Sequence, residues 1–395
     1  MGLFNFNKKV APTPQPVDVP NTFFDVIQMR GIDIPMPKET KGQDWVLFGH
    51  NNQFPLDLLD YRNTSATHDS IIEGKTNLIC GDGIMFAETR EASNSWLVNN
   101  FKQVPFYLKL DKIFWMVTRD YLTFGYSCFE VVYSMDRTRI VDMNWIDASR
   151  IACGKRNEFG EIEEYYYSEN WANWRQATPR KIDAYSPAEA TELDENGQFD
   201  NGGRQLVFIK NNDNNMDYYS LPNYFSALKW IKADGLMAEY NLAAIQNGFS
   251  PSIVFNFFKK PTPEERRMNT EAINARHGGP KNAGKAMVFY SDGKDGAPEV
   301  KTLDATNIDQ RLLTVADQIT QQIITAHRTH PALCGIPTGA KLGISTELLQ
   351  SFEIMNTMVI KPERKQVLDA FKAALLYNGI IKVQVEEISP IKIIN

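Results

Sequence analysis

The sequence has few of the features that would indicate secretion, membrane insertion or disulfide chemistry. Its cysteines are scattered and form no C-x-x-C pair: they are Cys80, Cys128, Cys153 and Cys334. Such isolated cysteines are typical of reduced structural thiols in a protein made in the cytosol. A run of eighteen apolar residues and a signal-peptide core are also missing. We therefore expect neither membrane spanning nor secretion.

An excess of basic residues is missing as well. The 395 residues carry 42 Lys and Arg against 48 Asp and Glu, which gives a formal charge of −6. A protein that grips DNA is usually basic, because neutralising phosphates supplies much of the affinity. The charge argues against a tight DNA binder, but it is compatible with a conduit through which DNA slides.

Motifs for catalysis and nucleotide binding are incomplete. G-x-S-x-G, H-E-x-x-H and a plausible Cys/His pair are absent. Gly279–Lys285 fits G-x-x-x-x-G-K, but Ala286 replaces the hydroxyl residue, and a predicted strand, Met287–Tyr290, follows where a phosphate loop needs a helix. Asp69–Thr76 ends in G-K-T but reads as a helix passing straight through. We predict no enzymatic activity and no cofactor.

The histidines do not form a convincing metal site. His327 and His330 are three residues apart and could share a helix face, but no third ligand lies near them in the sequence. We interpret them as surface or helix-terminus residues, whose positive charge would suit a helix C-terminus. His50 and His68 are isolated. We therefore predict no bound metal.

An aromatic group offers a possible nucleic-acid contact. Trp171, Trp174 and Tyr165–Tyr167 could stack on bases. The basic residues around them are matched by acidic ones, which favours packing on strands or a subunit contact instead.

Two long predicted helices organise the second half of the chain. They cover Pro222–Asn247 and Asn307–Thr329, and the second has one apolar stripe with a wide polar face. Residues 251–302 lie between them and have strands and a helix of their own. A loop with a glycine every four residues follows, and a third helix runs from Ser345 to Tyr377. The pattern indicates a helical stalk that carries a small α/β tip.

The first half alternates helices with strands. Pro55 opens one helix, and Ser65 or Thr67 caps a second that ends at Gly81. Further helices are predicted at Trp96–Phe101 and Leu108–Thr123, the latter ended by Gly125. Strands are predicted at Trp45–Phe48, Tyr126–Tyr133, Arg139–Met143, Ile162–Ser168, Lys181–Tyr185 and Gln205–Lys210, and one or two edge strands at Ile380–Ile393.

An ordered set of segments resembles the portal proteins of tailed bacteriophages, of the HK97-like type. The segments are FGYSCFEVVYS (Phe124–Ser134), IDASRIACGK (Ile146–Lys155), NGFSPSIVFNF (Asn247–Phe257), TPEERR (Thr262–Arg267), HGGPKNAGKAMVFYSDG (His277–Gly293) and AHRTHPALCGI (Ala326–Ile336). The resemblance covers roughly residues 63–377 and rests on the order of the segments, since no single motif is diagnostic.

The resemblance implies an α+β portal fold with named parts. These parts are a flexible N-terminal arm (1–42), a wing (43–220), a first stem helix (221–250), an α/β clip (251–302), a second stem helix (303–331), a tunnel loop (332–346), a long wing helix (347–378) and a short crown remnant (379–395). The implied function is a structural one. A ring, dodecameric if it follows the family, would sit at the unique vertex of the capsid in the virion and conduct double-stranded DNA during packaging and ejection.

The resemblance also implies sites and partners. The tunnel loop would meet DNA through Gly335, Thr338, Gly339, Lys341 and Gly343, and the clip would dock partners through Lys259, Lys260, Glu264, Glu265, Arg266 and Arg267. Expected partners are further copies of the chain, the large terminase subunit, a head–tail adaptor, the major capsid or scaffold protein, and DNA without sequence specificity. Assembly would take place in the host cytoplasm. Two alternatives stay open: another virion component, such as a minor capsid or adaptor protein, and a nucleotide-dependent DNA-processing enzyme.

Overall fold

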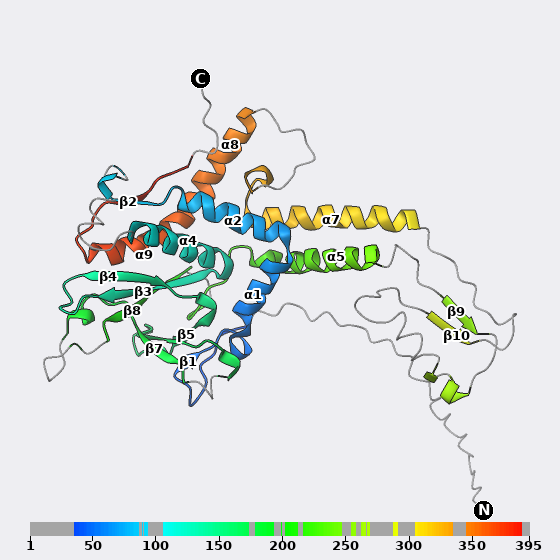
Figure 1. Ribbon diagram of the computed structural model, residues 1–395, viewed down its shortest axis with the longest axis horizontal. Helices are drawn as coiled ribbons and strands as arrows, with labels where there is room; N and C mark the ends of the chain where they lie inside the picture. The colour runs from blue at the N-terminus through cyan, green and yellow to red at the C-terminus, as the bar shows by residue number, and fades with distance from the viewer. Residues whose placement is uncertain are drawn as a thin grey trace, which may run out of the picture. The chain divides into compact units, whose positions relative to one another are not determined.

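The computed structural model of the chain shows a mixed α and β protein (Figure 1). It describes residues 35–86, 89, 91–93, 106–173, 178–192, 199, 202–211, 216–246, 254–257, 262–265, 267–268, 287–290, 305–334 and 345–388. The predicted helix Trp96–Phe101 and most of the predicted N-terminal arm lie outside these residues. Among the described helices, none is both long and apolar enough to cross a membrane.

A seven-stranded sheet forms the base of the described fold. Its spatial order is β1-β5-β6-β7-β8-β3-β4, and all neighbours are antiparallel except β7 and β8. The strands are β1 (Trp45–Val46), β3 (Tyr126–Tyr133), β4 (Ile140–Trp145), β5 (Ile151–Gly154), β6 (Glu164–Tyr167), β7 (Arg180–Ala184) and β8 (Arg204–Lys210). β3 has the bounds that its sequence predicts. β5 was not predicted, because a four-residue strand, Ile-Ala-Cys-Gly, shows little alternation.

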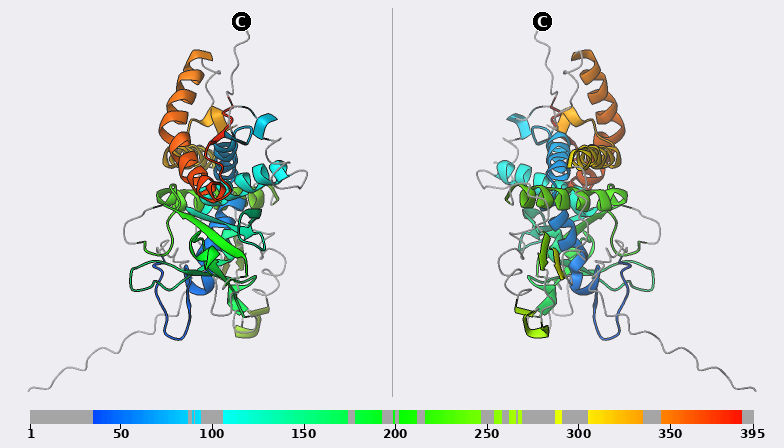
Figure 2. Two further views of the ribbon diagram at one scale, coloured as in Figure 1. Left: turned by 90° about the vertical axis from the view of Figure 1, so that its left-hand side faces the viewer. Right: turned by 90° about the vertical axis from the view of Figure 1, so that its right-hand side faces the viewer.

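Helices cover one face of this sheet. α4 (Phe106–Phe124) and α9 (Lys361–Leu376) pack against β3, β4 and β8, and α2 (Ala66–Cys80) lies on α4 and α9 (Figures 1 and 2). α1 (Gln53–Thr64) contacts α2, α4 and α5 (Leu228–Gln246) beside the sheet. The layers are joined by aromatic packing, since the ring of Phe371 on α9 stacks on Phe129 of β3 at 4.4 Å between centroids. Both side chains are fully buried, so this contact belongs to the core.

The predicted helix ends in this half are confirmed. Ser65 caps α2, because its hydroxyl accepts the backbone N–H of His68 at 3.2 Å. Gly81 follows α2 at φ 54°, and Gly125 follows α4 at φ 84°. A Cβ on Gly125 would lie 2.4 Å from the backbone of Leu221. Glycine is therefore required there both for its backbone angle and for the close approach of another segment.

Two long helices lie side by side: α5 (Leu228–Gln246) and α7 (Ala305–His327) (Figure 1). α7 agrees with the predicted helix within two residues at each end. α5 begins six residues later than predicted, after a 3₁₀ turn, η5 (Phe225–Ala227). Its start is shifted because the backbone N–H groups of Phe225 and Ala227 bond to carbonyls three residues back. The expected C-cap, Gly248, lies outside the described residues.

The third long helix agrees with the prediction of one helix from Ser345 to Tyr377 within one residue, but it is not uniform. It consists of α8 (Ser345–Met355), a π-helical turn (Asn356–Ile360) and α9. Pro362 stands at the start of α9, has no backbone N–H, and its ring excludes an ordinary helical turn before it. The widened turn, in which the N–H of Lys361 bonds to the carbonyl of Asn356, accommodates the proline.

Two small sheets complete the description. β2 (Ile84–Phe86) pairs with β11 (Val383–Val385), which is the one described strand in the predicted C-terminal edge region. β9 (Val254–Phe257) pairs in parallel with β10 (Met287–Tyr290), the strand predicted after the glycine-rich segment. At the predicted TPEERR helix start, Thr262 and Glu265 bond reciprocally, with the side chain of each accepting the backbone N–H of the other. This arrangement is a capping box.

The aromatic group packs within the sheet layer, as the preferred interpretation predicted. Trp171 and Tyr166 are buried, and the ring centroid of Trp45 lies 5.9 Å and 5.3 Å from theirs. Buried rings have no face free to stack on a base. Trp174 lies outside the described residues.

Candidate functional site at the root of the two long helices

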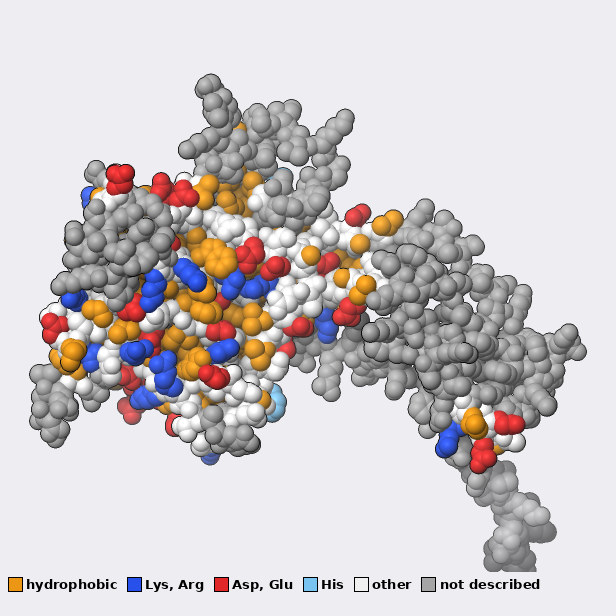
Figure 3. All heavy atoms as spheres, viewed as in Figure 1, with side chains coloured by type: hydrophobic (Ala, Val, Ile, Leu, Met, Phe, Trp, Pro, Cys, Tyr) orange, Lys and Arg blue, Asp and Glu red, His pale blue; other side chains and the backbone are white. Residues whose placement is uncertain are grey.

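Burial changes along α5 and α7. Near the sheet and α2, Leu228, Ile231, Ile319 and Ile323 are buried. Further along, apolar side chains face solvent in this single chain, and Figure 3 shows them along the two helices. The exposed set is Leu236, Tyr240 and Leu242 on α5 and Leu313 and Val315 on α7. The start of α5 and the end of α7, called here the roots of the two helices, are therefore buried in the core. The remaining, outer parts expose apolar surface that another molecule could cover.

α5 is fixed to α1 by a close crossing. A Cβ on Gly235 would lie 3.1 Å from the side chain of Thr64, closer than ordinary van der Waals contact. Beside it, the Ser65 hydroxyl donates to Asp234 Oδ2 at 2.6 Å. Ser65 thus caps α2 and holds α5 with the same side chain.

A buried histidine pair joins α7 to α2. His68 Nδ1 and His327 Nε2 are 2.8 Å apart, although 259 residues separate them in the chain. The ring of Tyr224 stacks on His327 at 4.9 Å and meets His68 edge-on at 4.3 Å. Tyr224 in turn donates its hydroxyl to the carbonyl of Thr123 at 2.5 Å. The three rings fix the point where α7 ends.

This pair corrects two interpretations of the sequence. His68 is not isolated, and His327 is not a surface residue, since it is only 3% exposed. Burial, and to a smaller extent the charge of nearby Arg62, lower the pKa of His68 to about 3. Burial, His68 and Lys75 hold the pKa of His327 well below its ordinary value. Both rings are therefore neutral, so the expected positive charge at the end of α7 is absent at this residue.

A second buried contact joins α2 to α9. Lys75 Nζ lies 2.8 Å from Glu363 Oε1, with side chains 3% and 7% exposed. Asn223 Nδ2 donates to the same oxygen at 3.0 Å. Beside it, Arg364 donates to the carbonyls of Ile79 and Leu78 at the end of α2 and pairs with Glu387 at 2.6 Å. The adjacent residues Glu363 and Arg364 of α9 thus bind the middle and the C-terminal end of α2.

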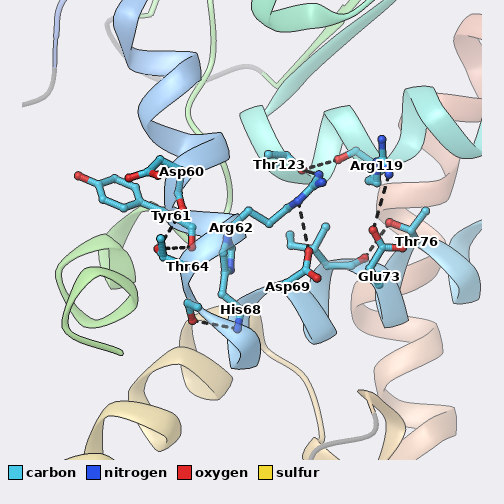
Figure 4. Close-up of polar contacts among 12 residues, drawn as sticks. Asp60, Tyr61, Arg62, Thr64, His68, Asp69, Glu73, Thr76, Arg119 and Thr123 are labelled. Carbon is cyan, nitrogen blue, oxygen red and sulfur yellow. Dashed lines mark hydrogen bonds and ion pairs between the residues drawn. The ribbon is translucent and has the colours of Figure 1, made fainter. Parts of the chain in front are cut away.

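A chain of polar contacts joins α1, α2 and α4, as drawn in Figure 4. Arg62 pairs with Asp69 at 3.3 Å and donates to Thr123 Oγ1 at 3.3 Å. Arg119 lies 3.9 Å from Glu73, and its guanidinium stands 4.7 Å over the ring of Trp115. These contacts tie the three helices together around the histidine pair.

The residues that the resemblance assigned to function are only partly described. Glu264, Glu265 and Arg267 of the clip surface are exposed, while Lys259, Lys260 and Arg266 lie outside the described residues. The tunnel-loop residues Gly335, Thr338, Gly339, Lys341 and Gly343 also lie outside them. The roles of both sets stay predictions. Within the described residues, no three His, Cys, Asp or Glu side chains gather in a way that could hold a metal ion.

Sequence reasoning missed Lys75 and Glu363. Asp69–Thr76 was correctly interpreted as a continuous helix, because α2 passes through it. Lys75 stands four residues from both Ile71 and Ile79, on the buried face of that helix. A charge at such a position must find a partner. That signal predicts a buried ion pair, but it does not reveal which carboxylate supplies it.

Several solved structures contain a chain of similar fold, and two of them are necks of GTA particles. The first is described as "Neck of empty GTA particle computed with C6 symmetry", with 14% identity, 84% of each chain covered and a TM-score of 0.49. A second, "Neck of native GTA particle computed with C12 symmetry", has 15% identity, 84% coverage of each chain and a TM-score of 0.47. These similarities are too low to carry an argument. No curated protein matches the chain in sequence.

The family model gives the decisive comparison. A model described as phage portal protein matches residues 106–389, which is more than two thirds of the chain. This range includes the sheet from β3 onwards, both long helices and the helices that follow them. The segments quoted from the sequence fall within the same range. The chain belongs to the phage portal protein family.

Proposed function

We propose that this chain is the subunit of a closed ring, dodecameric as in the family, that conducts double-stranded DNA at one vertex of a capsid. The proposal rests on membership of the phage portal protein family. A portal protein has a structural role and not an enzymatic one. The observation that carries it further is the pair of long helices with buried roots and exposed apolar outer parts. Identical subunits that pack head to tail would cover this surface with one repeated interface.

The parts of the subunit follow the division drawn from the sequence. Residues 43–220 and 347–378 form the wing, 221–250 and 303–331 the stem, 251–302 the clip, 332–346 the tunnel loop and 379–395 a reduced crown. The clip would dock the large terminase subunit during packaging and the head–tail adaptor afterwards. The wing would meet the major capsid or scaffold protein. The ring would reside in the virion after assembly in the host cytoplasm.

The charge of the chain suits a conduit. Each chain has a net charge of −6, so the ring would bind DNA phosphates only weakly. Weak phosphate contacts would let the DNA slide through the channel. Lys341 is the one charged residue of the tunnel loop. It would make weak contacts with phosphates that do not depend on sequence.

Ring formation can be tested on the exposed apolar surface. Leu313 on α7 is 68% exposed and Leu242 on α5 is 57% exposed in the single chain. Leu313→Glu and Leu242→Glu should prevent ring assembly, measured by native mass spectrometry. Met135 is 98% exposed on the turn between β3 and β4, so Met135→Glu is the matched control and should still form rings. Rings of normal size in both stem variants would contradict the proposal.

The enzyme alternative has a direct assay. ATP hydrolysis by the purified chain that disappears in Lys285→Ala would favour a nucleotide-dependent enzyme. The strand β10 begins one residue after Ala286, which is not the order of a phosphate loop. The second near match is a continuous helix whose lysine, Lys75, is held by Glu363. A minor capsid or adaptor role would instead give no closed ring with a through-channel.

A further inference from the structure

The buried histidine pair has a chemistry that a simple packing contact would lack. A hydrogen bond between two imidazole rings needs one nitrogen that donates and one that accepts, so at least one ring must be neutral at the contact. His68 Nε2 is buried without a hydrogen-bond partner in the described part of the chain. A bare acceptor is less costly there than an orphaned N–H. We therefore assign the donated proton to Nδ1 of His68 and the accepting lone pair to Nε2 of His327.

Protonation of either ring is unfavourable while the pair is closed. A proton added to His327 at Nε2 would place two N–H groups face to face across 2.8 Å. A proton added to His68 at Nε2 would create a charged N–H with no acceptor in a buried site. His68 is also the third residue of α2, where the positive end of the helix dipole opposes a further positive charge. His327, at the C-terminal end of α7, has the favourable dipole, but it is buried.

The surrounding charges do not rescue a protonated ring. The charges that act on the pair are Arg62 on α1 and Lys75 on α2. Other charged groups on the elements packed around it are Asp69 and Glu73 on α2, Arg119 on α4, Asp234 on α5 and Glu363 on α9, and Arg328 and the titratable His330 follow α7. Asp69 pairs with Arg62, Glu73 pairs with Arg119, Asp234 accepts from Ser65, and Glu363 pairs with Lys75. Each carboxylate therefore already has a partner. Arg62 and Lys75 add positive charge, which further opposes protonation.

We propose that the His68–His327 pair is an acid-operated latch: while both rings are neutral it holds the end of α7 against α2, and proton uptake releases it. The pair is placed to act on the segment that follows α7, because Pro331–Cys334 packs against α2 immediately beyond it. Release would free both the end of α7 and this turn from α2. The latch is a property of the fold and would operate whether or not the chain conducts DNA.

Hydrogen exchange of the full-length chain, followed by mass spectrometry between pH 8 and pH 5, tests the latch. After correction for intrinsic exchange rates, protection at the end of α7 and the start of α2 should fall together on acidification. If a released histidine regains its ordinary pKa near 6.5, the expected loss at pH 5 is about 30-fold for each ring that takes up a proton. The strand β3, which carries no histidine, should keep its protection.

Three variants separate the latch from general acid sensitivity. His68→Gln and His327→Gln should each make the loss of protection between pH 8 and pH 5 smaller by the factor of about 30 that the missing ring contributes. His50→Gln is the matched control, because His50 is exposed in the short turn η1, and it should behave as the wild type does. If the histidine variants do not fold, the proposal is still tested by the wild-type protein, in which acid should lower the protection of α7 but not that of β3. Equal protection at pH 8 and pH 5 at the end of α7, or an unchanged loss in a folded His68→Gln variant, would overturn the proposal.

Discussion

Lys75 on α2 and Glu363 on α9 form a buried ion pair, with 2.8 Å between Nζ and Oε1. Breaking such a pair leaves an uncompensated charge in the core. Glu363→Gln should therefore lower the free energy of unfolding by about 3–5 kcal/mol, measured by urea denaturation. The double replacement Lys75→Met with Glu363→Leu should recover most of that loss, because no buried charge remains.

The surface pair of Lys372 and Asp369 is the control for this measurement. Its side chains are 41% and 48% exposed, so Lys372→Ala should cost less than about 1 kcal/mol. An equal, small effect of Glu363→Gln and Lys372→Ala would show that the buried pair does not hold α2 to α9.

Ser65 connects two helices through one hydroxyl. It caps α2 through the N–H of His68 and donates to Asp234 on α5. Ser65→Ala should lower the free energy of unfolding by about 1–2 kcal/mol, at the upper part of the range for an N-cap, because the contact to α5 is lost as well. Thr191→Ala, which removes one exposed bond to the carbonyl of Ala188, should cost much less. Comparable losses in the two variants would argue against this role of Ser65.

The buried Asp120 should make the free energy of unfolding fall as pH rises, whereas the histidine pair should make it fall as pH decreases. Burial, and then the charge of Asp147, raise the pKa of the Asp120 carboxyl to about 7, although Trp145 Nε1 donates to it at 2.8 Å. Because the folded pKa exceeds the unfolded value of about 3.9, ionisation destabilises the fold as pH rises from about 4 to 7. Asp120→Asn keeps an acceptor for Trp145 and removes this ionisation.

The stability advantage of Asp120→Asn over the wild type should therefore grow by about 2–3 kcal/mol between pH 5 and pH 8. Chemical denaturation of both proteins at the two pH values measures it, and the pH 5 experiment serves as the control. An advantage that is constant with pH would mean that Asp120 titrates as an ordinary surface carboxylate.

The tunnel loop gives a functional prediction. If Lys341 touches phosphates and the glycines let the loop follow the DNA, Lys341→Ala and Gly339→Pro should each reduce the amount of DNA packaged per particle. Proline at position 339 restricts the backbone and leaves the charge intact, so the two variants test different properties. The length of packaged DNA, measured after particle purification, is the readout. Normal packaging by both variants would show that neither the charge of Lys341 nor the backbone freedom at Gly339 is needed for DNA packaging.

Local features of the fold were predictable because their causes lie within a few residues. The cap by Ser65, the glycine ends of α2 and α4, and the strand β3 follow from hydroxyl, glycine and β-branched or aromatic residues at the expected positions. The ordered segments that resemble portal proteins are local in the same sense. Pro362 is a further local signal, because a proline inside a helical pattern predicts a distortion such as the π-helical turn before it.

The contacts that build the candidate site were not predictable in this way. His68 and His327 are 259 residues apart, and Lys75 and Glu363 are 288 apart. One sequence shows that each side chain needs a partner, but the partner is chosen by how α2, α7 and α9 pack. The sequence therefore leaves His68 isolated and places His327 on the surface or at a helix terminus, whereas the structure shows both rings buried and neutral.

The central claim is that identical copies of this chain close into a ring around DNA. Electron microscopy of the purified full-length protein, with class averages viewed along the symmetry axis, tests it most directly. The account predicts closed rings with a central channel wide enough for a duplex, about 20 Å across, and Leu313→Glu should abolish them while Met135→Glu does not. Open filaments, or closed rings whose hole is too narrow for a duplex, would contradict it.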